Sequence, residues 1–151
     1  MAALDYTALA STTWKEVPPI CASTPVSGVD KEFVKKVRVN FGTTGTGLAA
    51  ADWATVLNIP AHTYVMSITS CIVVAEAADA AIVVGEGDAN ADWIAAQTGQ
   101  VADVCKSTIH TDANGKGKYF HTAGVITISA TSALDTLVID LYVLCMTIDP
   151  K

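Results

Sequence analysis

Residues 136 to 148 read TLVIDLYVLCMTI, and this segment decides the fold class. Apolar side chains occupy both of its alternating faces, and Asp140 is its one charged residue. The core of a β-sandwich can bury one of these two faces. The other face must be covered by a second sheet or a second copy of the chain. Burying a Leu or Val side chain stabilises the fold by about 1.5–3 kcal/mol, and this stabilisation is lost where the side chain stays in water. The segment predicts a strand in a homo-oligomeric β-sandwich, with the subunit interface at Leu137, Ile139, Leu141, Val143 and Cys145.

Other segments also favour strands. Residues 33–41 alternate between apolar and polar side chains, which is typical of a half-exposed antiparallel strand, and residues 63–75 carry no charge on either face. Shorter strands are expected at 80–84, 118–121 and 125–130. We expect a hairpin loop at the glycine-rich residues 42–47 and a helical turn at 48–53. The chain is rich in Ala, Thr, Val and Ile, with only 7% aromatic residues, so the sequence predicts an all-β domain.

Size and charge narrow the possible functions. The chain has 151 residues, of which 51% are hydrophobic, enough for one domain with a real core. Nine basic residues against fifteen acidic ones give a net charge of -6, which argues against nucleic acid or an anionic membrane as a partner. The longest apolar run, residues 63–75, is shorter than the roughly 20 residues of a membrane-spanning helix. The first residues lack the basic and apolar regions of a secretory signal.

The first 30 residues are predicted to form an extended N-terminal arm, with the sandwich domain at 31–151. They are rich in Ser, Thr and Pro and show no sustained periodicity, and Pro18-Pro19 and Pro25 favour an extended chain. Trp14, Lys15, Val17 and Ile20 are the candidate anchors of this arm on another surface. Five of the nine basic residues lie between Lys15 and Arg38, whereas residues 39–105 contain none, so the arm could also dock on an acidic neighbour. A flexible tail and a chance distribution of charge are the alternatives.

Cysteine and histidine spacing provides no metal signature. Cys21, Cys71, Cys105 and Cys145 are widely separated, and we expect free thiols in a reducing compartment. The spacing of Asp88, Asn90 and Asp92 matches the start of a calcium loop, but Trp93 and Gly99 stand where that loop requires Gly and Glu. The sequence therefore predicts neither a metal nor another cofactor.

Two further function classes remain open on the residues alone. A receptor- or glycan-binding module would use aromatic platforms, for which Trp53, Trp93 and Tyr119 are the candidates. An enzyme on this scaffold, a hydrolase or a lyase, would use Glu86, Asp88 or His121. No nucleophile elbow or paired-histidine motif supports catalysis, and we expect no catalytic residues.

Several short motifs resemble small virion proteins of tailed bacteriophages. They are Ile59-Pro60-Ala61-His62-Thr63, Ile82 to Asp88, Asp92-Trp93-Ile94 and Lys118-Tyr119-Phe120, followed by the double-faced last strand. In that group "IPAGT" and "VGDGD" recur in similar order, so His62 replaces a usual Gly and Glu86 replaces an Asp. The resemblance covers residues 56–148.

The resemblance implies a jelly-roll-like antiparallel β-sandwich that assembles as a homotrimer. It also implies a decoration or cement protein that binds the major capsid protein on the exterior of a phage head, assembled in the host cytoplasm. Such a protein acts by binding alone. The alternative within the same group is a receptor- or glycan-binding module of the head or of a tail fibre. Sandwiches of the immunoglobulin type share the same pattern of short strands and turns, and only the resemblance favours the jelly roll.

Overall fold

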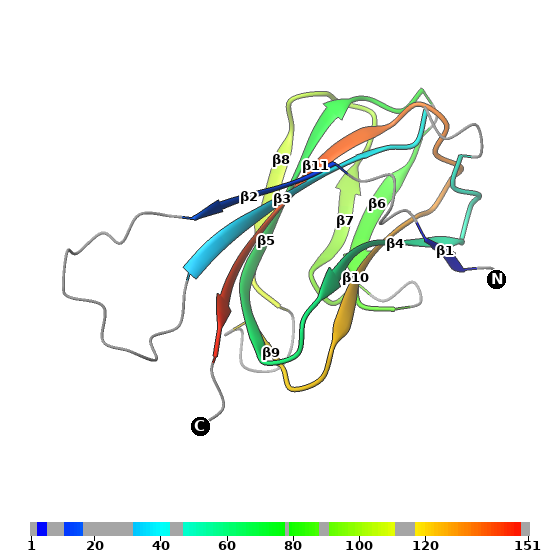
Figure 1. Ribbon diagram of the computed structural model, residues 1–151. Helices are drawn as coiled ribbons and strands as arrows, with labels where there is room; N and C mark the ends of the chain where they lie inside the picture. Colours follow the sequence, from blue (N-terminus) through cyan, green and yellow to red (C-terminus); the bar gives the residue numbers. More distant parts are fainter. Residues whose placement is uncertain are drawn as a thin grey trace.

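The structure, a computed structural model, describes residues 3–5, 11–16, 32–42, 47–77, 79–87, 91–110 and 117–148. Within these ranges the chain forms strands and turns but no helix (Figure 1). Accordingly, the described part contains no helix with the length and apolar character needed to cross a membrane. The all-β prediction is confirmed.

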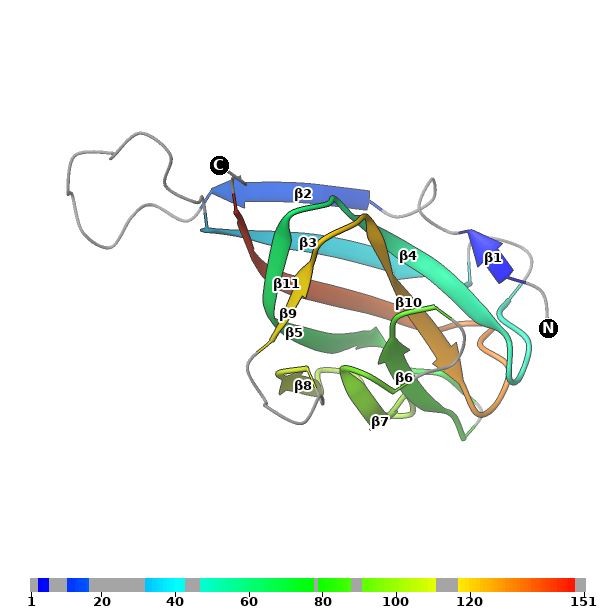
Figure 2. The same cartoon turned by 90° about the horizontal axis from the view of Figure 1, so that it is seen from below.

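Two sheets pack face to face (Figures 1 and 2). The six-stranded sheet has the order β2 (Ser11–Glu16), β3 (Glu32–Asn40), β11 (Val138–Thr147), β5 (Thr63–Val74) and β8 (Cys105–Thr108), and β9 (Lys118–Phe120) also pairs with β5. The five-stranded sheet has the order β1 (Ala3–Asp5), β4 (Trp53–Ile59), β10 (Gly124–Ala130), β6 (Ala81–Gly85) and β7 (Ile94–Thr98). The described pairings are antiparallel except that of β1 with β4.

Strand β11 is the centre of the six-stranded sheet. It pairs with β3 along one side, from Val138 opposite Asn40 to Met146 opposite Glu32, and with β5 along the other. Its side chains alternate between the two faces of the sheet, as the sequence predicted. On the inner face, Leu137 just before the strand and Ile139, Leu141, Val143 and Cys145 within it are 0–2% exposed. The last segment is therefore a strand, as predicted, and the structure shows that it is central in its sheet.

A β-bulge changes the phase of β5. The register against β11 shifts between Leu144, which faces Ser67, and Cys145, which faces Val65. The buried apolar residues of β5 are consequently Val65 on one side of the bulge and Ile68 and Ile72 on the other. Strict alternation over residues 63–75 placed Val65 and Ile68 on opposite faces, so that part of the prediction is wrong, because a bulge inserts one extra residue into the period.

Two connections also differ from expectation. The expected hairpin loop at residues 42–47 is wrong, because the flanking strands β3 and β4 belong to different sheets. The chain from Leu48 to Trp53 contains a turn closed by the bond from the Asp52 N–H to the Ala49 carbonyl, 3.1 Å, in place of a helical turn. Leu48 instead bridges to Leu134. Local alanine preference for helix is overridden here by pairing between loops.

Candidate functional site

The predicted interface residues of β11 lie in the core of a single chain. Leu137, Ile139, Leu141, Val143 and Cys145 point between the two sheets and are 0–2% exposed. A side chain that its own chain has already buried offers no area to a second copy, which corrects the interface assignment. The sequence showed that both faces of the strand are apolar, but it did not show which of them the second sheet covers.

The opposite side of this sheet, which we call the outer face, combines apolar residues with cations. Its apolar members are half-buried and come from the three central strands: Val34, Tyr64, Met66, Tyr142, Leu144 and Met146. Register places Leu144 beside Val34 and Met146 beside Tyr64, so these side chains form one continuous area. An antiparallel sheet with one solvated face normally presents polar residues outward. The outer face departs from that rule.

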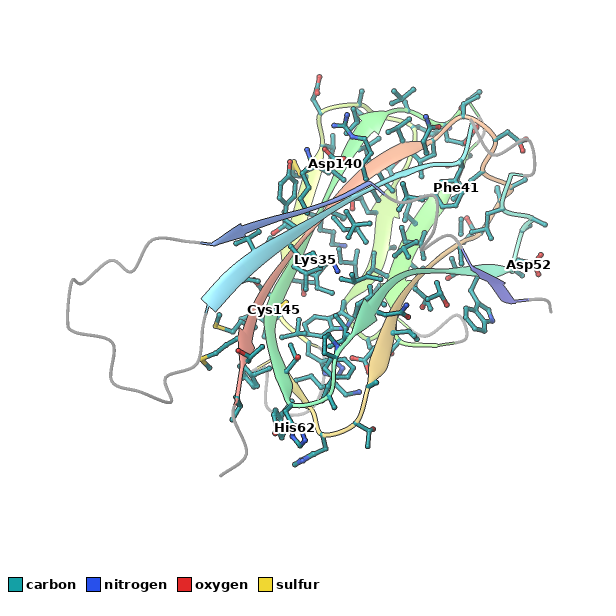
Figure 3. The ribbon with its side chains drawn as sticks, viewed as in Figure 1. Lys35, Phe41, Asp52, His62, Asp140 and Cys145 are labelled. Atoms are coloured by element: carbon teal, nitrogen blue, oxygen red, sulfur yellow. A yellow bond between two sulfur atoms is a disulfide. The ribbon has the colours of Figure 1, made fainter. Side chains whose placement is uncertain are left out.

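Asp140 anchors the charged part of the outer face (Figure 3). Arg38 donates two hydrogen bonds to its carboxylate, of 2.6 and 2.7 Å, and Lys36 lies 2.8 Å from Oδ2. Burial alone would raise the pKa of Asp140, but the hydrogen bonds from Arg38 and Lys36 outweigh it and hold that pKa below its usual value. Lys36 also lies 5.3 Å above the ring of Tyr142. Two cations thus share one carboxylate, and the cluster carries one excess positive charge.

A disulfide joins Cys71 of β5 to Cys105 of β8 beside this cluster. The two residues are direct partners in the register of the sheet, which widely spaced positions in a sequence do not disclose. The expectation of free thiols is therefore wrong for this pair. Cys145 is free and buried, and burial raises the pKa of its thiol to about 12. Cys21 lies outside the described residues.

Loops from four places in the sequence meet at one end of the sandwich. They comprise the described residues 41–42, 47–52, 74–77, 79–80, 99–104 and 131–137, and these carry Asp52, Glu76, Asp79, Asp103 and Asp135 but no Lys or Arg. Backbone hydrogen bonds tie them together, from Leu48 to Leu134 and from Glu76 to Gly99. We call this surface the acidic end. Among the described residues, three large hydrophobic side chains are exposed, and two of these, Val74 at 46% and Val101 at 51%, lie here.

Glu76 organises the acidic end from within. Its carboxylate accepts hydrogen bonds from the backbone N–H groups of Asp135, Thr136 and Leu137, at 2.8, 3.0 and 3.1 Å, and from the Thr136 hydroxyl at 2.9 Å. Burial alone would raise the pKa of Glu76, but these bonds and the one from the Ala77 N–H lower it to about 2. Sequence reasoning missed this residue, because its partners lie sixty positions away.

The motifs that carry the phage resemblance meet at a different part of the molecule. The Glu86 carboxylate accepts a hydrogen bond from Trp93 Nε1 at 3.0 Å and forms an ion pair with Lys118. His110 Nε2 lies 3.3 Å from the same carboxylate. The Glu86 N–H in turn donates to the Asp92 carboxylate at 3.1 Å. Residues from the 82–88, 92–94 and 118–120 motifs are therefore one connected polar cluster.

The first motif joins this group through its turn. His62 lies at the tip between β4 and β5 with a φ of 60°, the left-handed region that glycine tolerates best, and glycine is the usual residue of the resembling group at this position (Figure 3). Its Nδ1 lies 3.0 Å from the Tyr119 hydroxyl, and its N–H donates to the Phe120 carbonyl at 2.7 Å.

The candidate catalytic and sugar-binding residues are not gathered into a pocket by any described contact. Glu86 is engaged by three neighbours, whereas the exposed His121 packs edge-on against Tyr119 with ring centroids 4.3 Å apart. Trp93 is 1% exposed, so it cannot serve as a platform for a sugar. Trp53 and Tyr119 are half-buried, and Asp88 lies outside the described residues, as does Asn90 of the calcium-like spacing. No group of three potential metal ligands occurs among the described residues.

The described parts of the predicted arm lie at sheet edges. β1 pairs with β4 at one end of the five-stranded sheet, and β2 pairs with β3 at one end of the six-stranded sheet. Trp14 and Lys15 are in β2, opposite Lys35 and Val34, while Val17 and Ile20 lie outside the described residues. The division of the chain at residue 30 stays a prediction.

No protein-family model matches this chain, and no curated protein matches it. Three solved structures with a similar fold are chains of phage capsids. A chain of the cyanophage Pam1 capsid asymmetric unit is 15% identical with a TM-score of 0.62, over 87% of this chain and 95% of that one. A chain of the Ralstonia phage GP4 capsid is 12% identical with a TM-score of 0.56, over 99% and 100%. A chain of the acid-stable capsid of Helicobacter pylori bacteriophage KHP30 is 11% identical with a TM-score of 0.52, over 91% and 94%.

At these identities the likeness establishes the fold. The predicted jelly-roll-like antiparallel β-sandwich is thereby confirmed. The alignments cover 87–99% of this chain and 94–100% of the matched chains, so the likeness extends over both sheets of the sandwich.

Proposed function

We propose that this chain is a structural protein of a phage head: a homotrimer that decorates and cements the capsid shell from the outside. The observation that carries the proposal is the whole-chain likeness to chains in three phage capsids. The motif resemblance is a second line of support, since Glu86 contacts Trp93 and Lys118 in the fold and His62 contacts Tyr119.

The proposed mechanism is binding without catalysis. A homotrimer assembled in the host cytoplasm would attach to the major capsid protein and add contact area where shell subunits meet. The candidate catalytic carboxylate Glu86 is consistent with this, because Trp93, His110 and Lys118 already occupy its oxygens in a structural cluster.

The N-terminal arm is the proposed contact with the shell. β2 ends the six-stranded sheet and pairs with one described strand only, so its second edge has backbone groups that can accept a partner strand. The arm residues Trp14, Lys15, Val17 and Ile20 would add side-chain anchors to that pairing.

The test is co-sedimentation with empty shells of the phage that encodes the chain, prepared without it. The full chain should sediment with the shells, and a variant lacking residues 1–30 should stay in the supernatant as an intact trimer. Failure of the full chain to bind would refute the decoration role. Full binding by the truncated trimer would refute the role of the arm alone.

A further inference from the structure

Two surfaces of this chain are complementary to each other. The outer face combines half-buried apolar side chains, centred on Leu144 and Met146, with the excess positive charge of Lys36 and Arg38 over Asp140. The acidic end combines the exposed apolar side chains of Val74 and Val101 with aspartates and contains no basic residue. Each surface thus combines apolar side chains that are half-exposed or exposed with a net charge, and the two net charges are opposite in sign.

We infer that the outer face of one copy packs against the acidic end of the next copy, and that this contact builds the oligomer. The inference rests on one part of the proposed function, namely that the chain forms a homotrimer. Two different patches of the same chain meet in such a contact, so it is heterologous, and repetition around an axis closes a ring. The contact would cover the second apolar side of β11, where Tyr142, Leu144 and Met146 are only half-buried within the single chain.

The distribution of charge indicates that the partner bound at the outer face is a second copy of this chain. An acidic strip with apolar residues on any partner would suit the outer face, but this chain carries one on its own surface, at Asp79, Asp103 and Asp135, all of which are exposed. Opposite charges across an interface steer association and fix its register. They also make it sensitive to salt, because screening weakens charge pairs at the rim of an interface.

The interior of the acidic end is suited to a fixed contact surface. Glu76 holds the backbone of Asp135, Thr136 and Leu137 through three hydrogen bonds, and the Asp103 N–H donates to the Ile72 carbonyl at 2.8 Å. The loops that carry the aspartates therefore keep one geometry, which limits the conformational entropy lost on association.

The test measures the mass of variants by light scattering during size-exclusion chromatography. Wild type should have the mass of three chains at low salt. Leu144→Lys on the outer face and Val101→Lys at the acidic end should each have the mass of one chain. Ala95→Lys, an exposed position of β7 on the other sheet, is the matched control and should keep the mass of three. Circular dichroism establishes that each variant is folded, and Met146→Lys replaces Leu144→Lys if the latter is not.

Mixing the two monomeric variants decides whether the contact is heterologous. The Leu144→Lys chain keeps its acidic end and the Val101→Lys chain keeps its outer face, so a 1:1 mixture should form a species of two chains that dissociates in high salt. A mixture that stays at the mass of one chain overturns the pairing of these two surfaces. If both variants are folded and keep the mass of three chains, the proposed interface is wrong although the trimer stands. If the wild-type protein has the mass of one chain, both the proposed interface and the trimer are wrong. The binding to empty shells still tests the decoration role separately.

Discussion

Glu76 Oε2 accepts a hydrogen bond from the backbone N–H of Leu137, 3.1 Å away and sixty-one positions later in the chain. The same oxygen binds the N–H groups of Asp135 and Thr136, so one carboxylate fixes the connection between β10 and β11. Replacement by Gln keeps the shape but puts an amide donor among these N–H donors. We expect Glu76→Gln to lower the free energy of unfolding at pH 7 by about 2–3 kcal/mol, measured by urea denaturation. An unchanged midpoint would contradict this role.

The same carboxylate makes stability depend on pH in the acid range. The folded pKa of Glu76 is about 2 against an ordinary 4.5, so the unfolded chain takes up its proton first as the pH falls. The stabilisation is complete above pH 4.5 and is lost as the pH falls toward 2, amounting to about 3 kcal/mol for a shift of this size. Wild type should lose stability over this window more steeply than Glu76→Gln. Parallel curves for the two proteins would show that another group controls the acid transition.

The Cys71–Cys105 disulfide fastens the edge strand β8 to β5 and closes a loop with a sequence separation of 34. Loops of that size restrict the unfolded chain enough to stabilise the fold by about 3–4 kcal/mol. We expect dithiothreitol to lower the unfolding midpoint of wild type in urea. The control is the double variant Cys71→Ser/Cys105→Ser, which should start near the reduced value and respond little to the reductant. An equal response of both proteins would contradict the assignment.

His62 provides a test of backbone conformation at the turn between β4 and β5. Its positive φ favours glycine, whereas its ring gains a hydrogen bond with Tyr119. Both His62→Gly and His62→Ala lose that bond, but only the glycine variant relieves the backbone. We therefore expect His62→Gly to be more stable than His62→Ala by about 1 kcal/mol in thermal or urea unfolding. An alanine variant at least as stable as the glycine variant would contradict the left-handed turn.

Periodicity predicted the strands well because it reports burial on one or both faces. The segments at 33–41, 63–75 and 136–148 correspond to β3, β5 and β11. It could not predict the β5 bulge, because one extra residue leaves no sign in composition. Nor could it choose the face of β11 that lies in the core, since both faces are apolar and the second sheet comes from distant residues.

The surfaces proposed to act in assembly were less visible in the sequence. The acidic character of residues 39–105 was apparent, but the convergence of four loops at one end of the sandwich depends on the order of the strands. The disulfide likewise depends on the register of β5 and β8. The motifs that resemble phage virion proteins were recognisable, and the fold gives them a physical role in the cluster around Glu86 and in the turn at His62.

Quantitative mass spectrometry of purified particles of the phage that encodes this chain tests the central claim most directly. A decoration protein should be present in many copies, in a fixed ratio to the major capsid protein and in a multiple of three. It should also remain in heads from which the tails have been removed. Absence from purified heads, or a handful of copies that leave with the tails, would contradict the account.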